Sequence, residues 1–206
     1  MPQGSILGPL LFLSYIDDMR YCSDIVKFIL FADDTTIFYS SRDLNDLFNT
    51  MNNELSKLSE WLKVNKLSIN IKKTHYIIFG SRPVDPADVN LTFNGIPLEN
   101  VQSTKFLGVI IDSKLTWKAH IQHIVNKLSK ISGVIYKLRY LLNSKTTLLL
   151  YDAMVVPYLT YCAIVWAAAP KTTLNRLHLL QKRVLRLVVL AVDYHHLALF
   201  SKSLNG

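Results

Sequence analysis

The 206-residue chain has only two cysteines, no low-complexity segment, no internal repeat and no apolar run of membrane length. Cys22 and Cys162 cannot build a disulfide framework or a zinc knuckle, which predicts a reducing, intracellular setting. The apolar stretch at residues 155–169 is interrupted by Pro157, so we expect no membrane partner. No basic segment precedes the apolar residues of the N-terminus, which argues against a secretory signal.

Acidic side chains are scarce in the second half of the chain. Residues 101–206 carry 14 Lys/Arg against 3 Asp/Glu, a net charge of +11, whereas residues 1–100 carry 9 against 12, a net charge of −3. Half of all residues are apolar, which is enough for one sizeable core or two small lobes and excludes a disordered tail. The basic half suits a protein that holds a polyanion; a basic face without a partner is the alternative.

Two adjacent aspartates, Asp33 and Asp34, lie between two segments that read as β-strands. Residues 25–31 and 35–39 are rich in β-branched and aromatic side chains, and the short gap between them predicts a tight hairpin. Two carboxylates this close repel each other unless a cation compensates, and Mg²⁺ prefers oxygen ligands of this kind. Asp is also common in turns for its own hydrogen bonding, so the pair alone leaves ordinary turn chemistry open.

The remaining pattern predicts an α+β fold with a boundary near Asp112–Lys114. Residues 1–112 should form a lobe of strands and helices, and residues 113–206 an all-helical lobe. In the first lobe we expect a helix over 10–19 after Pro9, an amphipathic helix over 44–62, strands at 67–70, 75–79 and 104–111, a loop at 83–86 and a hairpin turning at Asn94-Gly95. In the second lobe we expect a long helix over 117–142, two shorter helices split near Pro157 and a basic helix over 174–187.

Four motifs follow one another in order: Pro2-Gln3-Gly4, Phe31-Ala32-Asp33-Asp34, Asn70-Ile71-Lys72-Lys73-Thr74 and Phe106-Leu107-Gly108. This series resembles the reverse transcriptases of non-LTR (LINE-type, jockey-like) retrotransposons. The resemblance runs from Pro2 to about His120 and continues more loosely to the end. It implies an RNA-directed DNA polymerase segment, with part of the polymerase palm at 1–112 and a helical thumb and connector at 113–206. The implied partners are an RNA template, a DNA primer and deoxynucleoside triphosphates.

The resemblance also implies roles in two-metal nucleotidyl transfer to a primer 3′-hydroxyl. Asp33 would be a direct ligand of Mg²⁺ (or Mn²⁺) and Asp34 its supporting neighbour, while Lys73 would neutralise or protonate the departing pyrophosphate. The other implied contacts are Gln3, Gly4, Phe31 and Ala32 with template and nucleotide, Phe106, Leu107 and Gly108 with the primer, and Lys182, Arg183 and Arg186 with the nucleic-acid backbone.

Part of the family's machinery is missing from the sequence. The family's first metal-binding aspartate precedes the Gln-Gly motif, so we expect an N-terminally truncated fragment that starts at this motif. A catalytically inactive nucleic-acid-binding remnant is the alternative function, and a structural helix bundle would explain residues 113–206 alone. A chain that acts as its family does would work in the nucleus. We expect His120 on a helix surface, and the aromatic residues of 158–166 mostly in the core.

Overall fold

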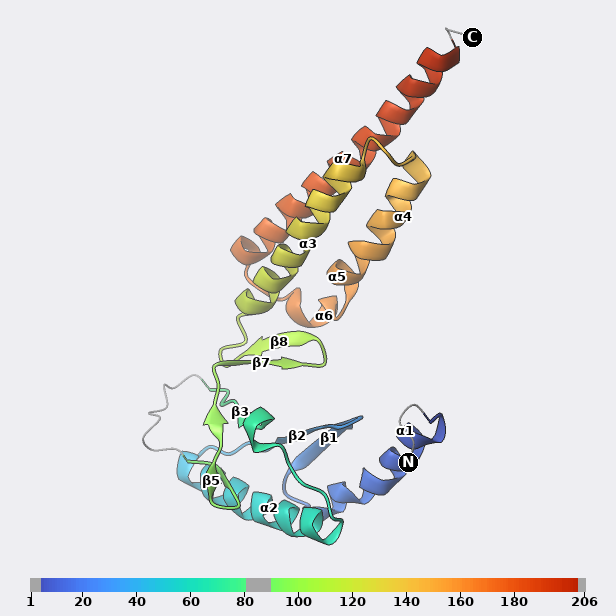
Figure 1. Cartoon of the computed structure of the whole chain (residues 1–206). Helices are drawn as coiled ribbons and strands as arrows, with labels where there is room; N and C mark the ends of the chain where they lie inside the picture. Colours follow the sequence, from blue (N-terminus) through green and yellow to red (C-terminus); the bar gives the residue numbers. More distant parts are fainter. Residues whose placement is uncertain (1–4, 81–89, 204–206) are drawn as a thin grey trace. The chain divides into compact units, whose positions relative to one another are not determined.

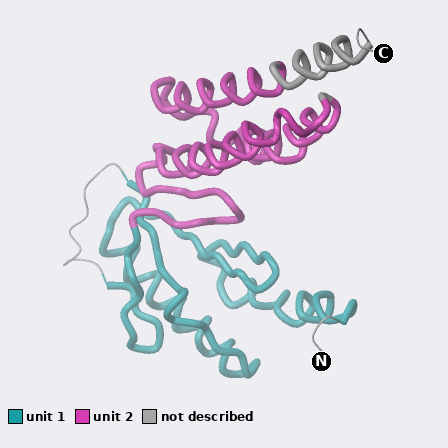
Figure 2. The backbone as a smooth tube through the Cα atoms, turned by 45° about the horizontal axis from the view of Figure 1, so that its top comes forward, with its two compact units in different colours: residues 1–101 teal, residues 102–206 magenta. Residues whose placement is uncertain are grey.

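The computed structural model describes residues 5–80 and 90–203, and the chain divides into two compact units, residues 1–101 and 102–206 (Figure 2). Helices are mixed with small two-stranded sheets, as the α+β prediction requires. The division falls before the predicted boundary at Asp112–Lys114, because the hairpin at residues 103–112 belongs to the helical unit. Each unit has its own hydrophobic core.

In residues 5–80 and 90–101, the first unit combines two α-helices with three small sheets. Its elements are α1 (Leu7–Ile16), the 3₁₀ helix η1 (Asp17–Cys22), β1 (Lys27–Phe31), β2 (Asp34–Phe38), α2 (Leu44–Val64), the 3₁₀ helix η2 (Ile71–Lys73), β3 (His75–Tyr76), β4 (Thr92–Phe93), β5 (Ile96–Pro97) and β6 (Glu99–Asn100). β1 pairs antiparallel with β2, and β4 with β5, whereas β3 and β6 are parallel. The long helix α2 runs along the β1–β2 hairpin and shares its core (Figure 1).

Helix α2 forms because its apolar residues recur at helical spacing and its start is capped. Asp43 has an extended backbone, and its side chain accepts a hydrogen bond from the Asn45 N–H at 3.3 Å. The buried apolar residues of the helix are Phe48, Leu55, Leu58 and Leu62. The helix predicted over 44–62 is therefore confirmed, and it supplies the surface on which the hairpin rests.

Several predicted elements of the first unit differ from the structure. Residues 67–70 are irregular backbone rather than a strand, and only His75 and Tyr76 form a strand within 75–79. Leu67, Ile69 and Ile71 each pack against the core. The backbone N–H of Leu67 donates a hydrogen bond to the Leu62 carbonyl at the end of α2. The helix predicted over 10–19 begins earlier and becomes 3₁₀ after Ile16.

The predicted hairpin at Asn94-Gly95 is confirmed. These two residues connect β4 to β5, and their φ values of +53° and +77° match the mirror-image turn that suits a right-twisted hairpin. The loop predicted at 83–86 lies outside the described residues.

The second unit packs a small hairpin with a group of helices. Its elements are β7 (Ser103–Phe106), β8 (Val109–Asp112), α3 (Lys118–Leu138), α4 (Ser144–Met154), α5 (Val156–Thr160), α6 (Ala163–Trp166) and α7 (Lys171–Ser203). Figure 1 shows α3, α4 and α7 side by side. The fully buried side chains include Ile121, Leu128, Ile135, Val155 and Val184. Among the described residues, no helix is long and apolar enough to cross a membrane.

The helical predictions for this unit are largely confirmed. The apolar seam over 117–142 becomes α3, which ends at Leu138. Pro157 lies in the first turn of α5, where its missing N–H removes no helical hydrogen bond, and it separates α4 from α5 as predicted. The strand predicted over 104–111 is instead two short strands folded back on each other at Leu107-Gly108.

Candidate functional site

Asp33 and Asp34 lie at the tip of the β1–β2 hairpin. Phe31 pairs with Asp34 in the antiparallel register, so the loop consists of Ala32 and Asp33 alone. Ala32 has a φ of +52°, and the tight two-residue hairpin loops take a positive φ at their first position. Asp33 therefore belongs to the turn, whereas Asp34 is the first residue of β2.

The hairpin has one packed face and one open face. Phe28, Leu30 and Ile37 turn toward the core of the first unit. Directly paired residues of an antiparallel sheet lie on the same face, so Phe31 and Asp34 share the opposite, outer face. Residues 31–35 are all exposed, and Phe31 retains 59% of its accessible surface. The tip thus presents an aromatic ring beside a carboxylate, with Asp33 adjoining them.

This acidic pair can supply only part of a metal coordination sphere. Mg²⁺ requires near-octahedral oxygen coordination and usually keeps several waters beside one or two carboxylates. In residues 5–80 and 90–203, no group of three or more His, Cys, Asp or Glu side chains could hold an ion. Asp17 of the same unit is paired with Arg20 at 2.9 Å. The donors at the tip therefore fit an open site, in which water or phosphate oxygens fill most positions.

Lys73 lies in a compact turn built around one carbonyl. The Asn70 carbonyl accepts hydrogen bonds from the Lys73 N–H at 2.9 Å, the Thr74 N–H at 3.1 Å and the Thr74 hydroxyl at 3.0 Å. The Lys73 side chain is exposed, and in the described part of the chain it forms no ion pair. The Asn-x-x-Lys-Thr spacing is thus explained by the turn, which holds the backbone of Lys73 while its ammonium remains in solvent.

The Phe106-Leu107-Gly108 motif joins β7 to β8: Phe106 is the last residue of β7, and Leu107 and Gly108 form the turn. Leu107 and Gly108 have φ values of +44° and +87°, so both central positions are left-handed. Gly108 has a second constraint, because a Cβ at this position would lie 3.2 Å from Cε1 of Tyr161. Glycine is therefore favoured both by the backbone conformation and by the close approach of an aromatic ring.

Lys182, Arg183 and Arg186 are exposed on α7. Arg183 and Arg186 are one turn apart and share a side of the helix. Val184 and Val188 of the same helix are buried in the core of the second unit. Where the chain is described, none of the three cations forms an ion pair with a carboxylate. Their charge is available to an external anion.

The sequence profile described as Reverse transcriptase (RNA-dependent DNA polymerase) matches residues 1–111, more than half of the chain. The chain belongs to the reverse transcriptase family. It is 30% identical over 201 residues to the "Probable RNA-directed DNA polymerase from transposon BS" of Drosophila melanogaster, and 28% identical over 197 residues to the "RNA-directed DNA polymerase from mobile element jockey" of the same species. The resemblance to jockey-like retrotransposon polymerases is confirmed.

These alignments cover 91% and 90% of the reverse transcriptase chain, but only 22% and 21% of the two relatives. The chain thus spans about a fifth of the length of the curated relatives it matches. No solved structure matches the chain. The family match includes the aspartate hairpin, the Lys73 turn and the Leu107-Gly108 turn, and it ends before α3 begins.

The reverse transcriptase motifs are distributed over both units. The tip of the β1–β2 hairpin brings together Phe31, Ala32, Asp33 and Asp34, and Lys73 lies on another segment of the same unit. The second unit contains Phe106, Leu107, Gly108, Lys182, Arg183 and Arg186. Gln3 and Gly4 lie outside the described residues.

Tyr161 is a residue at the Leu107-Gly108 turn that the sequence did not single out. Its hydroxyl donates a hydrogen bond to the Leu107 carbonyl at 2.6 Å. Its own carbonyl accepts one from Nε1 of Trp166 at 2.9 Å. Trp166 is buried, but Tyr158 and Tyr161 retain 37% and 53% of their accessible surface, so the prediction that the aromatic residues of 158–166 lie mostly in the core is wrong. In the sequence, only Gly108 indicated that another residue packs closely against this turn.

His120 is buried, so the prediction of a helix-surface histidine is wrong. Its Nδ1 accepts a hydrogen bond from the Ile110 N–H at 3.3 Å, and its ring meets Trp166 edge to face with centroids 6.0 Å apart. Burial lowers the pKa of His120, and the neighbouring His123 lowers it further. The neutral imidazole joins β8 to α3, so with Tyr161 it fixes the hairpin to the helices at two points.

Asp112 organises the connection from β8 to α3. Its carboxylate accepts hydrogen bonds from the N–H groups of Lys114 at 3.2 Å, Thr116 at 3.0 Å and Trp117 at 2.8 Å. Burial raises the pKa of Asp112, but these donors favour the ionised form, and the net result is a pKa below the ordinary value. The last residue of the Phe-Leu-Gly-Val-Ile-Ile-Asp segment is thus structural.

Proposed function

We propose that this chain is the part of a non-LTR retrotransposon RNA-directed DNA polymerase that carries the Asp-Asp hairpin, the primer-contacting turn and the helical thumb. The observation that carries the proposal is the exposed Phe31-Ala32-Asp33-Asp34 tip, which lies inside the family match. The relatives named as polymerases of mobile elements support the same reaction.

The hairpin would hold a catalytic metal ion. Asp33, free in the turn, would be a direct ligand of Mg²⁺ or Mn²⁺, and Asp34 would stabilise it from the first position of β2. A bound divalent ion would lower the pKa of the primer 3′-hydroxyl and neutralise charge on the reacting phosphates. Phe31 is exposed on the same face as Asp34 and would contact the incoming nucleotide together with the Ala32 backbone. An open donor set suits this role, because substrate phosphate oxygens must complete the coordination.

Lys73 would act on the leaving pyrophosphate. Its backbone is held by the Asn70 carbonyl, so only the flexible side chain must be ordered when substrate binds. An ammonium group placed there would neutralise the developing charge or donate a proton to the departing oxygen.

The second unit would bind the primer and the hybrid duplex. Gly108 is exposed, so a phosphate or sugar would approach the Leu107-Gly108 turn on the side that the Tyr161 ring leaves open. The hydrogen bond from Tyr161 to the Leu107 carbonyl would hold the turn in place. Lys182, Arg183 and Arg186 would contact the sugar-phosphate backbone of an RNA–DNA hybrid, which proteins contact largely through phosphates and 2′-hydroxyls.

The experiment that tests the proposal replaces the matching segment of the Drosophila jockey polymerase with this chain and measures primer extension on an RNA template. Extension should require Mg²⁺ or Mn²⁺ and should be abolished by Asp33→Asn. Asp24→Asn, which removes a carboxylate outside the hairpin tip, is the matched control and should retain extension. Equal activity of the two variants would refute a catalytic role for the hairpin, provided that both chimaeras are folded and bind hybrid duplex.

A second function, binding of nucleic acid without catalysis, is favoured by a different observation. The net charge of +11 over residues 101–206 is accompanied by exposed cations on α7, and the described residues bring no third metal ligand to the hairpin. The 206-residue chain would then bind primer–template duplex at low salt and extend nothing. Failure of the chain to bind duplex at low salt would exclude this function, since phosphate-driven binding is strongest there.

A further inference from the structure

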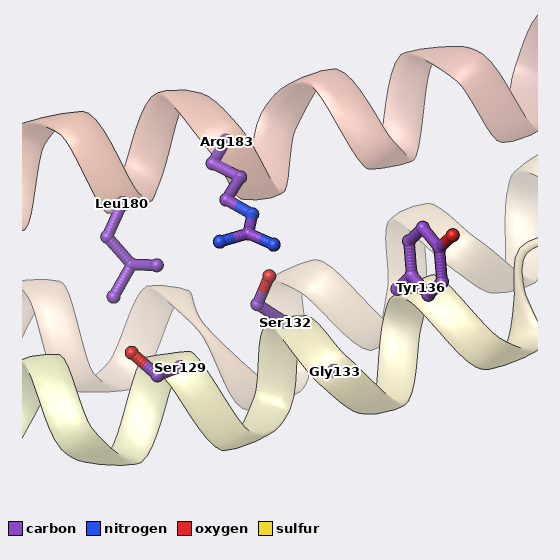
Figure 3. Close-up of a pocket in the computed structure, with 6 residues that line it drawn as sticks. All are labelled: Ser129, Ser132, Gly133, Tyr136, Leu180 and Arg183. Atoms are coloured by element: carbon purple, nitrogen blue, oxygen red, sulfur yellow. The ribbon is translucent and has the colours of Figure 1, made fainter.

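A recess between α3 and α7 combines one guanidinium with three hydroxyl groups (Figure 3). Its volume is about 180 Å³. The lining residues are Ser129, Ser132, Gly133 and Tyr136 from α3 and Leu180 and Arg183 from α7. Figure 3 shows the Arg183 guanidinium reaching from α7 toward Ser132 on the opposite helix. The recess thus has hydrogen-bond donors on both walls.

The donor set of the recess selects an anion with several oxygen acceptors. Arg183 offers five N–H donors and no acceptor, and each hydroxyl can turn to donate. No carboxylate in the described part of the chain forms an ion pair with Arg183. A planar guanidinium fork fits a phosphate group with two parallel hydrogen bonds. The volume lies below the roughly 300–1,000 Å³ of pockets that enclose whole small ligands, so a single phosphate group fits and a complete nucleotide does not.

Gly133 provides a second, independent observation. A glycine inside a helix costs about 0.5–1 kcal/mol relative to alanine. At Gly133 an added Cβ would meet no atom within 4 Å, so helix packing does not require a glycine there. Its absent side chain instead leaves the wall of the recess open, opposite the Arg183 guanidinium.

We propose that this recess is a seat for one backbone phosphate of a nucleic acid, held by the Arg183 guanidinium and the hydroxyl of Ser132, which lies opposite it in Figure 3. The unit around it carries a large excess of positive charge, and exposed Lys182 and Arg186 lie on the same helix as Arg183, so a polyanion is favoured over an isolated phosphate. The choice of partner rests on the proposed function. The recess would hold one phosphate at a fixed place, whereas exposed cations alone would contact the backbone without fixing its position.

The test measures binding of a fluorescent RNA–DNA hybrid to the full 206-residue chain over a range of salt concentrations. Gly133→Leu fills the recess without changing charge, and Leu is a good helix former. Its matched control is Val134→Leu, which enlarges the next, exposed residue outside the lining. Arg183→Lys keeps the charge but removes the fork. Its control is Arg176→Lys, at an exposed position of the same helix that lies outside the lining and outside the proposed contacts. Gly133→Leu and Arg183→Lys should each weaken binding about tenfold, and the controls by less than about twofold.

Three outcomes would contradict the proposal in different ways. If all four variants bind hybrid equally and are folded by circular dichroism, the seat is refuted while nucleic-acid binding stands. If the unaltered chain does not bind hybrid at low salt, the proposed nucleic-acid contact fails as well. If inorganic phosphate, followed by ³¹P NMR, is lost from Gly133→Leu while hybrid binding is unchanged, the recess takes free phosphate and its assignment to a nucleic-acid backbone is wrong.

Discussion

Replacing Gly108 by alanine is expected to destabilise the second unit for two separable reasons. The backbone reason is the φ of +87°, because an L-residue in a left-handed conformation costs about 1–2 kcal/mol. The packing reason is the distance of 3.2 Å between the new Cβ and Cε1 of Tyr161. The ring cannot move away without weakening the 2.6 Å hydrogen bond from its hydroxyl to the Leu107 carbonyl. We therefore expect Gly108→Ala to lower the free energy of unfolding by about 2–4 kcal/mol.

The chain contains its own control for the backbone reason. Gly95 has a similar φ of +77°, but a Cβ there would meet nothing within 4 Å. Gly95→Ala should therefore cost only about 1–2 kcal/mol. Urea denaturation of the full chain, followed by circular dichroism and tryptophan fluorescence, measures both variants. A Tyr161→Ala background should reduce the cost of Gly108→Ala to that of Gly95→Ala. An unchanged cost in that background would refute the close approach of Tyr161 as its cause.

Three further predictions concern pH, the connecting loop and activity. Because burial lowers the pKa of His120 below the ordinary 6.5, the unfolded chain takes up a proton more readily. The second unit should therefore be fully stable above pH 6.5 and lose stability as the pH falls below it. His120→Gln should remove this pH dependence, which urea titrations at pH 5 and pH 7 would measure. Asp112→Asn should cost about 1–3 kcal/mol by weakening hydrogen bonds to Lys114, Thr116 and Trp117; since the pKa of Asp112 lies below 3.8, the unaltered chain should keep this contribution above pH 3.8 and lose it only at lower pH. The 206-residue chain alone should bind Mn²⁺ weakly, and Asp33→Asn should abolish the broadening by Mn²⁺ of NMR signals from the hairpin. The chain alone should show no primer extension. Extension by this chain unaided would show that a further metal ligand has been missed.

The sequence predicted those features that depend on local physics. The α2 and α3 helices, the Asn94-Gly95 turn and the break at Pro157 follow from apolar spacing, capping and backbone preferences. The strand at 67–70 was wrong because alternating apolar residues can also reach a core from irregular backbone. The Leu67 N–H bonds to the end of α2, and the Asn70 carbonyl accepts bonds from the following turn, so both ends of the segment are bonded outside a sheet.

The tertiary part of the site could not be predicted in the same way. The motif showed that Gly108 matters, but Tyr161 lies far along the chain, in an apolar segment that reads as core. His120 was expected on a helix surface, yet its ring contacts the Ile110 N–H and Trp166. Such contacts depend on which helix face packs against which strand, and a single sequence does not directly specify these tertiary contacts.

The attachment of the Leu107-Gly108 turn has a mechanical consequence. Tyr161 holds the tip of the β7–β8 hairpin, and His120 holds its second strand, so hairpin and helices form one rigid part. The covalent crossing between the two units lies at residues 101–102, ahead of the hairpin. Any movement of the helical unit would therefore carry the Leu107-Gly108 turn along with the helices as one body.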